Sequence, residues 1–466
     1  MLYLSVLSVV AASPFHQANS SIFLTKLEKV MLYFKPFFIA ISLISITANG
    51  EVRVERISVS SSNAEGNSIS EPGSVTNDGR FVSFTSGSFN LVPDDFNDGL
   101  DFSYSILRDR EIETNSWVLE PAVRSRPILY PILTPDGRFI VFLTGQTNLI
   151  PGDTSLPDFF RKDLYTNTIE RVNQPPSGGN SNGSGEESAA ISADGRFIAF
   201  TTTANDLVNG DMDNLPDVFV RDMSSNFIEQ ISVSSEGTST LDGVAFYPDI
   251  SGDGRYIVFS SSSSQLGLPA GSPPNVFIRD RLNRTTTRVS LGVGGEEPNG
   301  RSGFGYLRAA VSDDGRWVLF GSEASNLVLN DTNDKSDLFL ADQENETISR
   351  ISLNANNEQI DMNVGFSSMS ADGSRITYTI IEQSDHLLML FDRSLGLRVV
   401  LNRGDDNQIY GRALQQKLSA NGQFLIIRGN DEILRENGDD NDDVFLFDLR
   451  NVIQIFSNGF EAGIGN

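Results

Sequence analysis

The sequence predicts an all-β protein, a seven-bladed β-propeller built from four-stranded antiparallel blades. Two observations predict it. A phrase close to Ser-x-Asp-Gly-Arg-aromatic-Ile/Val-x-Phe recurs along the chain, and short strand-like segments flank every copy. The turn residue of the phrase recurs at spacings of 58, 58, 59, 61, 58 and 49 residues, at Asp78, Asp136, Asp194, Asp253, Asp314, Asp372 and Asn421. A nearly fixed period of this size indicates one supersecondary unit repeated in space.

The third repeat shows the four strands of one blade most clearly. A first strand over 189–192 leads into the Asp194-Gly195 turn, because Asp-Gly supplies the positive φ angles that a two-residue hairpin needs. A second strand over 197–201 is almost wholly apolar, which indicates burial on both faces. A third strand is expected over 217–222. The fourth, over 229–233, alternates polar and apolar residues as a half-exposed outer strand does.

The other repeats follow the same order. Their second strands carry an aromatic residue at one position: Phe84, Phe142, Phe259, Phe320 and Tyr378. Every third strand is expected to end at an aspartate: Asp109, Asp163, Asp222, Asp280, Asp342, Asp392 and Asp448. Four-stranded antiparallel units arranged radially form a propeller, which leaves only short, protected edges.

Closure of the ring requires an outer strand for the last blade. Segment 56–60 precedes the first repeat and matches the outer-strand pattern of 288–291 and 350–353. We therefore expect the N-terminal segment to close the ring. The alternative is 452–456, which directly follows the last third strand and fits the pattern less well.

The recurring phrase, together with Asp217-Val218-Phe219-Val220-Arg221-Asp222, resembles the repeats of the TolB-type β-propeller family. The resemblance covers the chain from about residue 52 to about residue 456. It implies a propeller and protein–protein interaction in the bacterial envelope, although a fold alone does not fix function. TolB itself carries an additional N-terminal α/β domain, for which we expect no room here.

Residues 1–50 carry no repeat and are predicted to be a leader and signal peptide. Met31 opens a segment in which Lys35 supplies positive charge, 37–46 an apolar core, and Ala48-Asn49-Gly50 small residues for cleavage. We therefore expect translation to start at Met31 and the mature chain to lack a transmembrane segment, since the apolar run is too short to span a bilayer. A retained anchor is the alternative. The expected organisation is leader 1–50, propeller 51–457 and C-terminal tail 458–466, in a periplasmic or secreted protein.

Composition narrows the possible partners. The chain has no cysteine, which excludes disulfides, a thiolate nucleophile and cysteine-ligated metal. Its net charge of −26 becomes −28 once the three lysines and one glutamate of residues 1–50 are removed. This charge repels nucleic acid and anionic lipid, and it favours solubility or cationic partners. The alternative is a solvated acidic exterior, which accounts for most of the charge. We expect a monomer that binds a protein or peptide in the cell envelope and does not bind nucleic acid.

Acidic residues cluster in the loops between second and third strands. In three repeats, carboxylate or amide oxygens occupy positions one, three and seven: Asp95, Asn97, Asp101; Asp211, Asp213, Asp217; and Asp331, Asn333, Asp337. Alternating oxygen donors in a tight loop suit calcium, the one cofactor that the sequence suggests. The alternative is turn formation, because Asp and Asn side chains also bond their own backbone.

Candidate catalytic groups are few, and none is assigned. His386 is the only histidine after residue 50, and one histidine cannot build a multi-histidine metal site. The phrase 179–183 matches Gly-x-Ser-x-Gly but lacks the strand–turn–helix context of a nucleophile elbow. The arginines that follow the Asp-Gly turns are expected to pair with the aspartates that end the third strands, linking neighbouring blades: Arg80, Arg138, Arg196, Arg255 and Arg316.

Strand order predicts which end of the ring binds a partner. First-to-second and third-to-fourth turns are short, whereas the other connections are long and polar and share the opposite end. We call that end the long-loop face. The sequence favours a non-catalytic binding or scaffold protein that uses this face. The alternative is a carbohydrate- or peptide-degrading hydrolase or lyase with its site in the propeller channel.

Overall fold

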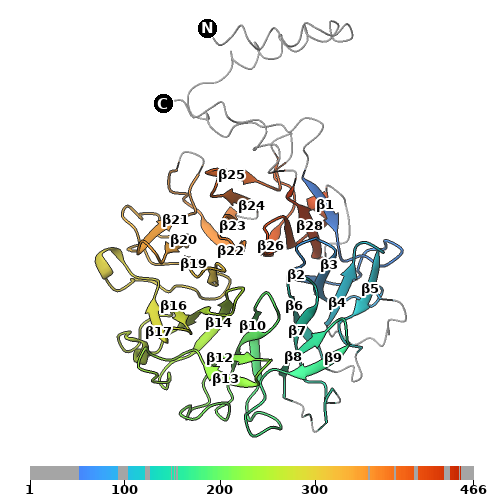
Figure 1. Cartoon of the computed structure of the whole chain (residues 1–466). Coiled ribbons are helices and arrows are strands. Elements are labelled where there is room, and N and C mark those ends of the chain that lie inside the picture. Colours follow the sequence, from blue (N-terminus) through green and yellow to red (C-terminus); the bar gives the residue numbers. More distant parts are fainter. Residues whose placement is uncertain are drawn as a thin grey trace, which may run out of the picture. The chain divides into compact units, whose positions relative to one another are not determined.

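The computed structural model describes residues 52–92, 103–120, 126–147, 149–151, 153, 156–354, 357–382, 385–403, 408–434, 441–450 and 452. They form seven four-stranded antiparallel sheets arranged around a common centre (Figure 1), which confirms the seven-bladed propeller. The chain separates into two compact units, 1–45 and 46–466, and the propeller lies in the second. The predicted leader, including Met31, lies outside the described residues, as does the tail over 458–466.

Each blade runs from an inner strand at the ring centre to an outer strand at its rim (Figure 1). Blades one to three comprise β2 (Ser70–Val75), β3 (Phe81–Ser86), β4 (Tyr104–Asp109) and β5 (Thr114–Trp117); β6 (Ile128–Leu133), β7 (Phe139–Thr144), β8 (Asp158–Asp163) and β9 (Thr168–Arg171); β10 (Gly185–Ile191), β11 (Phe197–Thr202), β12 (Asp217–Asp222) and β13 (Phe227–Gln230).

Blades four to seven comprise β14 (Ala245–Ile250), β15 (Tyr256–Ser261), β16 (Asn275–Asp280) and β17 (Thr285–Arg288); β18 (Ala310–Val311), β19 (Trp317–Ser322), β20 (Asp337–Asp342) and β21 (Thr347–Arg350); β22 (Asn363–Met369), β23 (Arg375–Glu382), β24 (Asp385–Asp392) and β25 (Leu397–Val400); β26 (Ala413–Leu418), β27 (Phe424–Gly429), β28 (Asp443–Asp448) and β1 (Arg53–Arg56). The helical elements that lie wholly within the described residues are short 3-10 turns.

The core lies between adjacent blades. Second strands are buried almost throughout, as their continuous apolar runs predict. Aromatic pairs stack between second and third strands, for example Phe200 with Phe219 at 6.0 Å between ring centroids. One apolar cluster joins Val218 and Val220 of blade three to Ile257 and Phe259 of blade four. Burial of this area between neighbours therefore holds the ring together.

The Asp-Gly turn forms the joint between blades. Gly195 has a φ of +74°, and a Cβ atom built there would lie 2.2 Å from Cδ2 of Phe139 in the preceding blade. Only glycine therefore fits both the turn and the contact. The expected aspartate partners of the turn arginines are confirmed, for example Arg196 with Asp222 at 2.6 Å. The expectation that these pairs link neighbouring blades is wrong, because both residues belong to the same blade.

The N-terminal segment supplies the outer strand of blade seven. β1 pairs antiparallel with β28 (Figure 1). In this pairing, Arg56 lies opposite Phe445. The strand ends at the arginine that was expected to begin it, and the outer strands of the other blades are displaced in the same direction. The buried Ile-Ser-Val segment after the arginine lies outside the strand. Ile57 still donates its amide to the Val444 carbonyl at 2.7 Å, and Ser58 Oγ donates to Asp443 at 2.5 Å. Of the alternative segment 452–456, only Val452 is described, and it packs in an apolar cluster.

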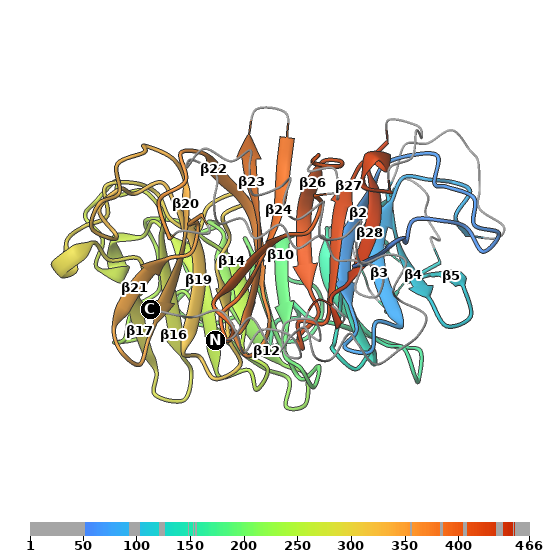
Figure 2. The ribbon, with the colours of Figure 1, turned by 90° about the horizontal axis from the view of Figure 1, so that it is seen from above.

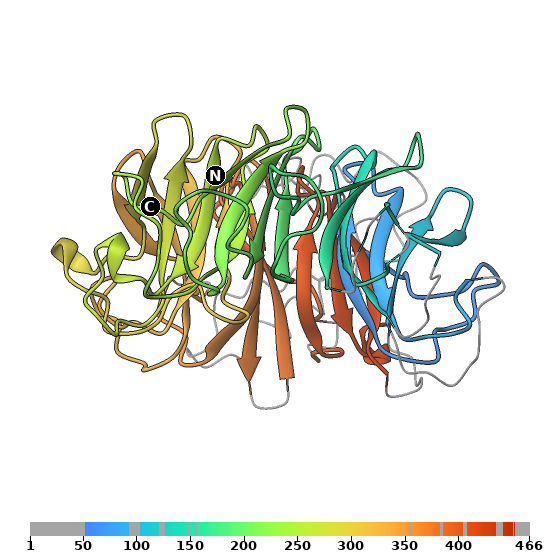
Figure 3. The same ribbon diagram turned by 90° about the horizontal axis from the view of Figure 1, so that it is seen from below.

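Loops emerge from the blades at both ends of the strands, as the edge-on views show (Figures 2 and 3). The Asp-Gly turns and the third-to-fourth turns occupy one end, and the longer connections occupy the long-loop face. Among the described residues, no helix has the length and apolar character needed to cross a membrane.

Candidate functional site

Three carboxylates converge on the long-loop face of blade three. Asp211 and Asp213 lie in the loop between β11 and β12, and Asp217 is the first residue of β12. One carboxylate oxygen of each lies within 4.8 Å of the others. Asp217 is 0% exposed and Asp211 is 8% exposed. We call this group the blade-three carboxylate cluster.

The cluster presents oxygens that no described residue satisfies. Oδ1 of Asp217 accepts hydrogen bonds from Ser232, at 2.6 Å, and from Thr240. Its Oδ2 is buried without a hydrogen-bond partner among the described residues, as are one oxygen of Asp211 and one of Asp213. Buried charged oxygens without partners are costly, so the arrangement calls for a cation or for protons.

The pKa values of these carboxyl groups also indicate that the cluster needs a cation or protons. Burial raises the pKa of Asp217 to about 7, and the charge of Asp211 adds to the effect. Burial also raises the pKa of Asp211 to about 6, with further contributions from the charges of Asp213 and Asp206. A bound cation reverses this balance because it favours the ionised carboxylates.

In three other blades, an arginine neutralises the carboxylates at the corresponding place. In blade two, Arg171 pairs with Asp153 and lies 3.1 Å from Asp158, which begins β8. The corresponding arginines are Arg350 in blade five and Arg56 in blade seven. Arg350 lies 3.3 Å from Asp331 and 3.7 Å from Asp337, and Arg56 lies 2.7 Å from Asp431 and 3.3 Å from Asp443. Each guanidinium therefore neutralises two buried carboxylates.

Blade three has a neutral glutamine at this arginine position. Gln230 pairs with Phe219 in the register in which Arg171 pairs with Phe160 and Arg350 with Phe339. Blade four keeps its arginine, Arg288, but begins its third strand with neutral Asn275 instead of aspartate. Within the described residues, blade three alone combines three clustered carboxylates with no arginine to neutralise them.

The sequence singled out nine calcium-ligand candidates, and the structure separates them. It brings Asp211, Asp213 and Asp217 together. Asn333 donates to the Ile360 carbonyl at 2.7 Å, while Asp331 and Asp337 face Arg350. The set Asp95, Asn97 and Asp101 lies outside the described residues. Gln230, in place of an arginine, distinguishes blade three in the sequence. This difference can be recognised only once the strand register is known.

The residues considered for catalysis have structural contacts. His386 Nδ1 lies 3.2 Å from the Ala413 carbonyl oxygen. Ser181 is buried, donates to the Gly183 carbonyl at 3.1 Å and accepts from Asn173 at 3.1 Å. These contacts tie both side chains to neighbouring loops and strands.

Sequence reasoning missed an aromatic patch on or beside the inner strands of blades four to six: Phe246, Tyr247, Phe304, Tyr306 and Phe366. Phe246 contacts Phe304 at 5.6 Å and Tyr306 contacts Phe366 at 5.4 Å between ring centroids, so the patch crosses two blade boundaries. The Arg308 guanidinium lies 4.3 Å from the centroid of Tyr247. Tyr306 is 57% exposed. No sequence period marks these residues, because bulges and an irregular entry to β18 place them.

Fold and repeats together define a seven-bladed β-propeller with a carboxylate-rich loop face. No family model matches the chain, and no match is found among curated proteins. Solved structures do match. An oligogalacturonate lyase from Vibrio parahaemolyticus shares 10% identity over 86% of this chain and 99% of its own, with a TM-score of 0.53. An acylaminoacyl peptidase shares 12% identity over 82% of this chain and 51% of its own, with a TM-score of 0.50.

TolB from Acinetobacter baumannii also matches, at 20% identity over 64% of this chain, with a TM-score of 0.37. The aligned part spans 58% of that TolB and about half of the peptidase. At these identities, similarity to the lyase and the peptidase shows the fold alone. The propeller that the TolB-type repeats implied is confirmed by the seven four-stranded sheets. A lyase and a peptidase share this fold, so the fold alone does not fix what this chain does.

Proposed function

We propose that the protein is an exported, non-catalytic binding propeller that contacts a protein or peptide partner through its long-loop face. A calcium ion held by the blade-three carboxylate cluster stabilises part of that face. The observation that carries the proposal is the cluster itself, in which buried, unpaired carboxylate oxygens lie beside exposed apolar side chains.

Exposed apolar side chains support the choice of face. Most of the exposed large apolar residues that the structure describes lie in long connections: Ile69, Phe89, Leu156, Met212, Leu215, Val293, Phe304, Tyr306 and Leu329. Met212 is 75% exposed and lies between Asp211 and Asp213, and Leu215 precedes Asp217 by two residues. An ion that orders this loop therefore also positions two apolar side chains for a partner.

Oxygen chemistry selects calcium among common cations. The cluster offers only carboxylate oxygens, and the chain has no cysteine. Calcium accepts six to eight oxygen ligands in a flexible geometry, whereas magnesium demands a smaller and stricter octahedron. Asp211, Asp213 and Asp217 would each supply a carboxylate oxygen to the ion.

Calcium binding is tested by thermal unfolding of the protein in calcium and in chelator. Binding to the native state alone stabilises it by about 2.7 kcal/mol at a hundredfold excess over Kd. We expect calcium to raise the melting temperature by a few degrees, magnesium to act weakly, and Asp217→Asn to reduce the calcium effect. Equal melting curves in calcium and in chelator would leave these residues as turn formers.

Partner binding is tested by chemical crosslinking in the native envelope, with the wild-type protein and a Met212→Ser/Leu215→Ser variant. We expect a specific crosslinked protein that is lost in the variant and in chelator. Ile112→Ser at the opposite end is the matched control, because Ile112 is also exposed. Crosslinks that persist in the loop variant would contradict the assignment to this face.

Export is tested by N-terminal sequencing of the protein from a cell fraction. We expect a mature chain that begins near residue 51 and elutes as a monomer in size-exclusion chromatography. A cytoplasmic protein that retains residues 31–50 would contradict the export part of the proposal.

A second candidate function is degradation of a carbohydrate or peptide at the propeller channel. The aromatic patch favours it, together with Asp249, whose pKa burial raises, as suits a general acid. Asp249 Oδ2 accepts from the Val311 amide at 2.9 Å, which also fits a structural role. Turnover of a glycan or peptide panel that disappears in Asp249→Asn would replace the binding proposal with this one.

A further inference from the structure

The joints between blades repeat one arrangement, which we call the blade junction. At each junction, the first residue of the second strand in one blade packs against the turn glycine of the next blade. Phe197 of blade three and Gly254 of blade four are one such pair. In five junctions an arginine donates to the carbonyl of that glycine at 2.5 to 2.8 Å: Arg110 to Gly79, Arg161 to Gly195, Arg281 to Gly254, Arg393 to Gly373 and Arg375 to Gly422.

The junction between blades three and four shows how the arginine is held. The Arg281 guanidinium carbon lies 4.6 Å from the ring centroid of Phe197. Its Nη1 donates to the Gly254 carbonyl at 2.6 Å, and its Nε donates to Glu229. Between blades five and six, Arg393 lies 3.5 Å from the centroid of Trp317 and donates to the Gly373 carbonyl at 2.6 Å. Arg161 likewise lies 4.5 Å from the centroid of Phe139, so three junctions combine an aromatic ring with a carbonyl, and both suit a planar cation. Between blades six and seven, Arg375 itself occupies the position of the ring.

The junction between blades four and five lacks this arginine. Gln343 follows Asp342 at the position at which Arg281 follows Asp280 and Arg393 follows Asp392. The position from which Arg161 reaches the junction of blades two and three is taken by Ile278. No described residue donates a hydrogen bond to the Gly315 carbonyl. A second guanidinium lies near Phe139, Phe197 and Trp317. Among the arginines that the structure describes, Arg255 alone lies over the ring of Tyr256.

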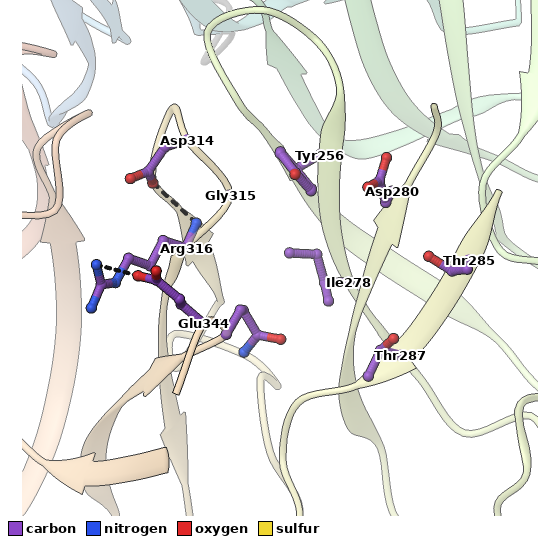
Figure 4. Close-up of a pocket in the computed structure, with 10 residues that line it drawn as sticks. Tyr256, Ile278, Asp280, Thr285, Thr287, Asp314, Gly315, Arg316 and Glu344 are labelled. Carbon is purple, nitrogen blue, oxygen red and sulfur yellow. Dashed lines mark hydrogen bonds and ion pairs between the residues drawn. The ribbon is translucent and has the colours of Figure 1, made fainter. Parts of the chain in front are cut away.

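A pocket of about 460 Å³ lies at this junction. Tyr256, Ile278 and Thr287 line it from blade four, and Asp314, Arg316 and Glu344 line it from blade five (Figure 4). Asp280 and Gly315 complete the part of the lining that matters here. The pocket thus keeps the ring and the carbonyl that the other junctions use to hold a guanidinium.

We propose that this pocket binds the guanidinium group of an arginine side chain that a partner protein contributes. The Tyr256 ring and the Gly315 carbonyl take the roles that Phe197 and Gly254 have for Arg281. The type of ligand is therefore inferred from the arginine that occupies the corresponding place at other junctions of this protein.

The charges around the pocket also favour a guanidinium group as its ligand. Three carboxylates line the pocket, those of Asp280, Asp314 and Glu344, and two arginines lie beside them. Asp280 pairs with Arg255 and Glu344 with Arg316, so the carboxylates exceed the cations by one, and the whole chain has a net charge of −26. Burial raises the pKa of Tyr256, the charges of Asp280, Asp253 and Asp314 raise it further, and the charge of Arg255 opposes them. The ring therefore lies in a negative potential that attracts a cation. Arginine fits better than lysine because its planar fork both stacks on a ring and donates several hydrogen bonds.

The junction between blades one and two also lacks the arginine, so it can be compared with the junction between blades four and five. Leu164 follows Asp163 there and packs in an apolar cluster with Phe81 and Leu107. Apolar packing thus replaces the arginine at that junction, whereas polar Gln343 and three carboxylates surround the pocket between blades four and five. The proposed site lies at the short-turn end of the ring, so it is independent of calcium and of the long-loop face.

The experiment uses the whole protein and fluorescein-labelled Gly-Ser peptides that carry one arginine, one lysine or one citrulline at the same place. Fluorescence anisotropy in physiological salt measures their binding. We expect the arginine peptide to bind at least tenfold more tightly than the other two. Gln343→Arg supplies the missing side chain from within, so it should weaken arginine-peptide binding at least tenfold and raise the melting temperature.

Tyr165→Arg is the matched control. Tyr165 is 91% exposed and occupies the turn position of blade two that Glu344 occupies in blade five, so this variant adds the same charge at the same end without reaching the pocket. It should leave peptide binding within about twofold of wild type. If Gln343→Arg does not fold, Tyr256→Leu provides the decisive variant, because it removes the ring while keeping apolar volume.

Three outcomes would overturn the proposal. Equal affinity for the arginine and lysine peptides would indicate general attraction to an acidic surface. Binding that survives both Gln343→Arg and Tyr256→Leu would place the peptide elsewhere. Competition by free arginine amide at the affinity of the peptide would assign the pocket to a small molecule instead of a partner protein.

Discussion

The charge of one side chain separates blade three from blades two, five and seven. All four place a buried aspartate at the start of the third strand, but the outer strand opposite it ends in arginine three times and in Gln230 once. A buried carboxylate without a counter-charge is costly, so this exchange is the basis of the proposal that blade three holds a calcium ion. Local sequence could show the acidic loops but not this contrast, since Gln230 lies on a different strand from the carboxylates it fails to neutralise.

The Gln230→Arg variant tests whether the missing arginine makes blade three a calcium site. The new guanidinium should pair with Asp211 and Asp217 as Arg350 pairs with Asp331 and Asp337. We expect the melting temperature in chelator to rise by a few degrees and the calcium-induced shift to disappear. The reciprocal variant Arg350→Gln should lose stability in chelator and regain part of it in calcium. A calcium shift that survives Gln230→Arg would place the ion elsewhere.

The aspartates that end the third strands make stability depend on acid pH. The hydrogen bond from Arg196 lowers the pKa of Asp222 in the folded protein below that of an unfolded aspartate, which is about 3.9. This contribution is fully present above about pH 4 and is lost as the pH falls through the folded pKa. The difference in melting temperature between wild type and Asp222→Asn should therefore be largest near pH 7 and should shrink below about pH 4. A difference that is constant with pH would assign the effect to packing.

At the scale of the strand, the repeat phrase predicted most of each blade. The third strand of blade three spans Asp217–Asp222 as expected, because polar residues mark both of its ends. Outer strands were displaced by two or three residues, since the buried Ile-Ser-Val segments imitate strand alternation although serine hydroxyls there contact the third strand, as Ser232 contacts Asp217. A period-two pattern cannot distinguish a sheet pairing from such a buried connection.

The Asp-Gly turn offers a test at this scale. Gly195 and Gly178 both have positive φ, at +74° and +77°, but a Cβ atom at Gly178 would meet nothing within 4 Å. Gly178→Ala should therefore cost about 1 kcal/mol for backbone strain alone. Gly195→Ala adds the clash with Phe139 and should cost about 2 to 4 kcal/mol in chemical denaturation. Equal costs for the two variants would show that the contact across the junction yields without penalty.

For the whole molecule, the ring depends on one strand from the start of the propeller sequence. The pairing of β1 with β28 joins residues that are almost 400 positions apart, and Arg56 adds buried ion pairs to Asp431 and Asp443. The repeat count alone established seven blades, whereas the closing strand had two candidates that the pattern could rank but not decide. Strand pairing in the folded ring decides it.

Truncation measures what this strand contributes. A chain that begins at residue 51 should unfold at the same temperature as the mature protein. A chain that begins at residue 58 loses β1 and Arg56, so it exposes the edge of β28 and leaves Asp431 and Asp443 without their arginine. We expect a loss of at least about 3 kcal/mol and a tendency to aggregate. Equal stability of the two chains would show that another segment completes blade seven.

The same pairing sets the order of events during folding. β1 is among the first parts of the propeller to leave the ribosome or a translocation pore, yet its partner strand β28 emerges almost last. Contacts so distant in sequence close slowly, because a long loop must be ordered before they form. The ring therefore cannot become complete until nearly the whole chain is available. A chain with this topology reaches its final state on whichever side of a membrane its C-terminal blade is released.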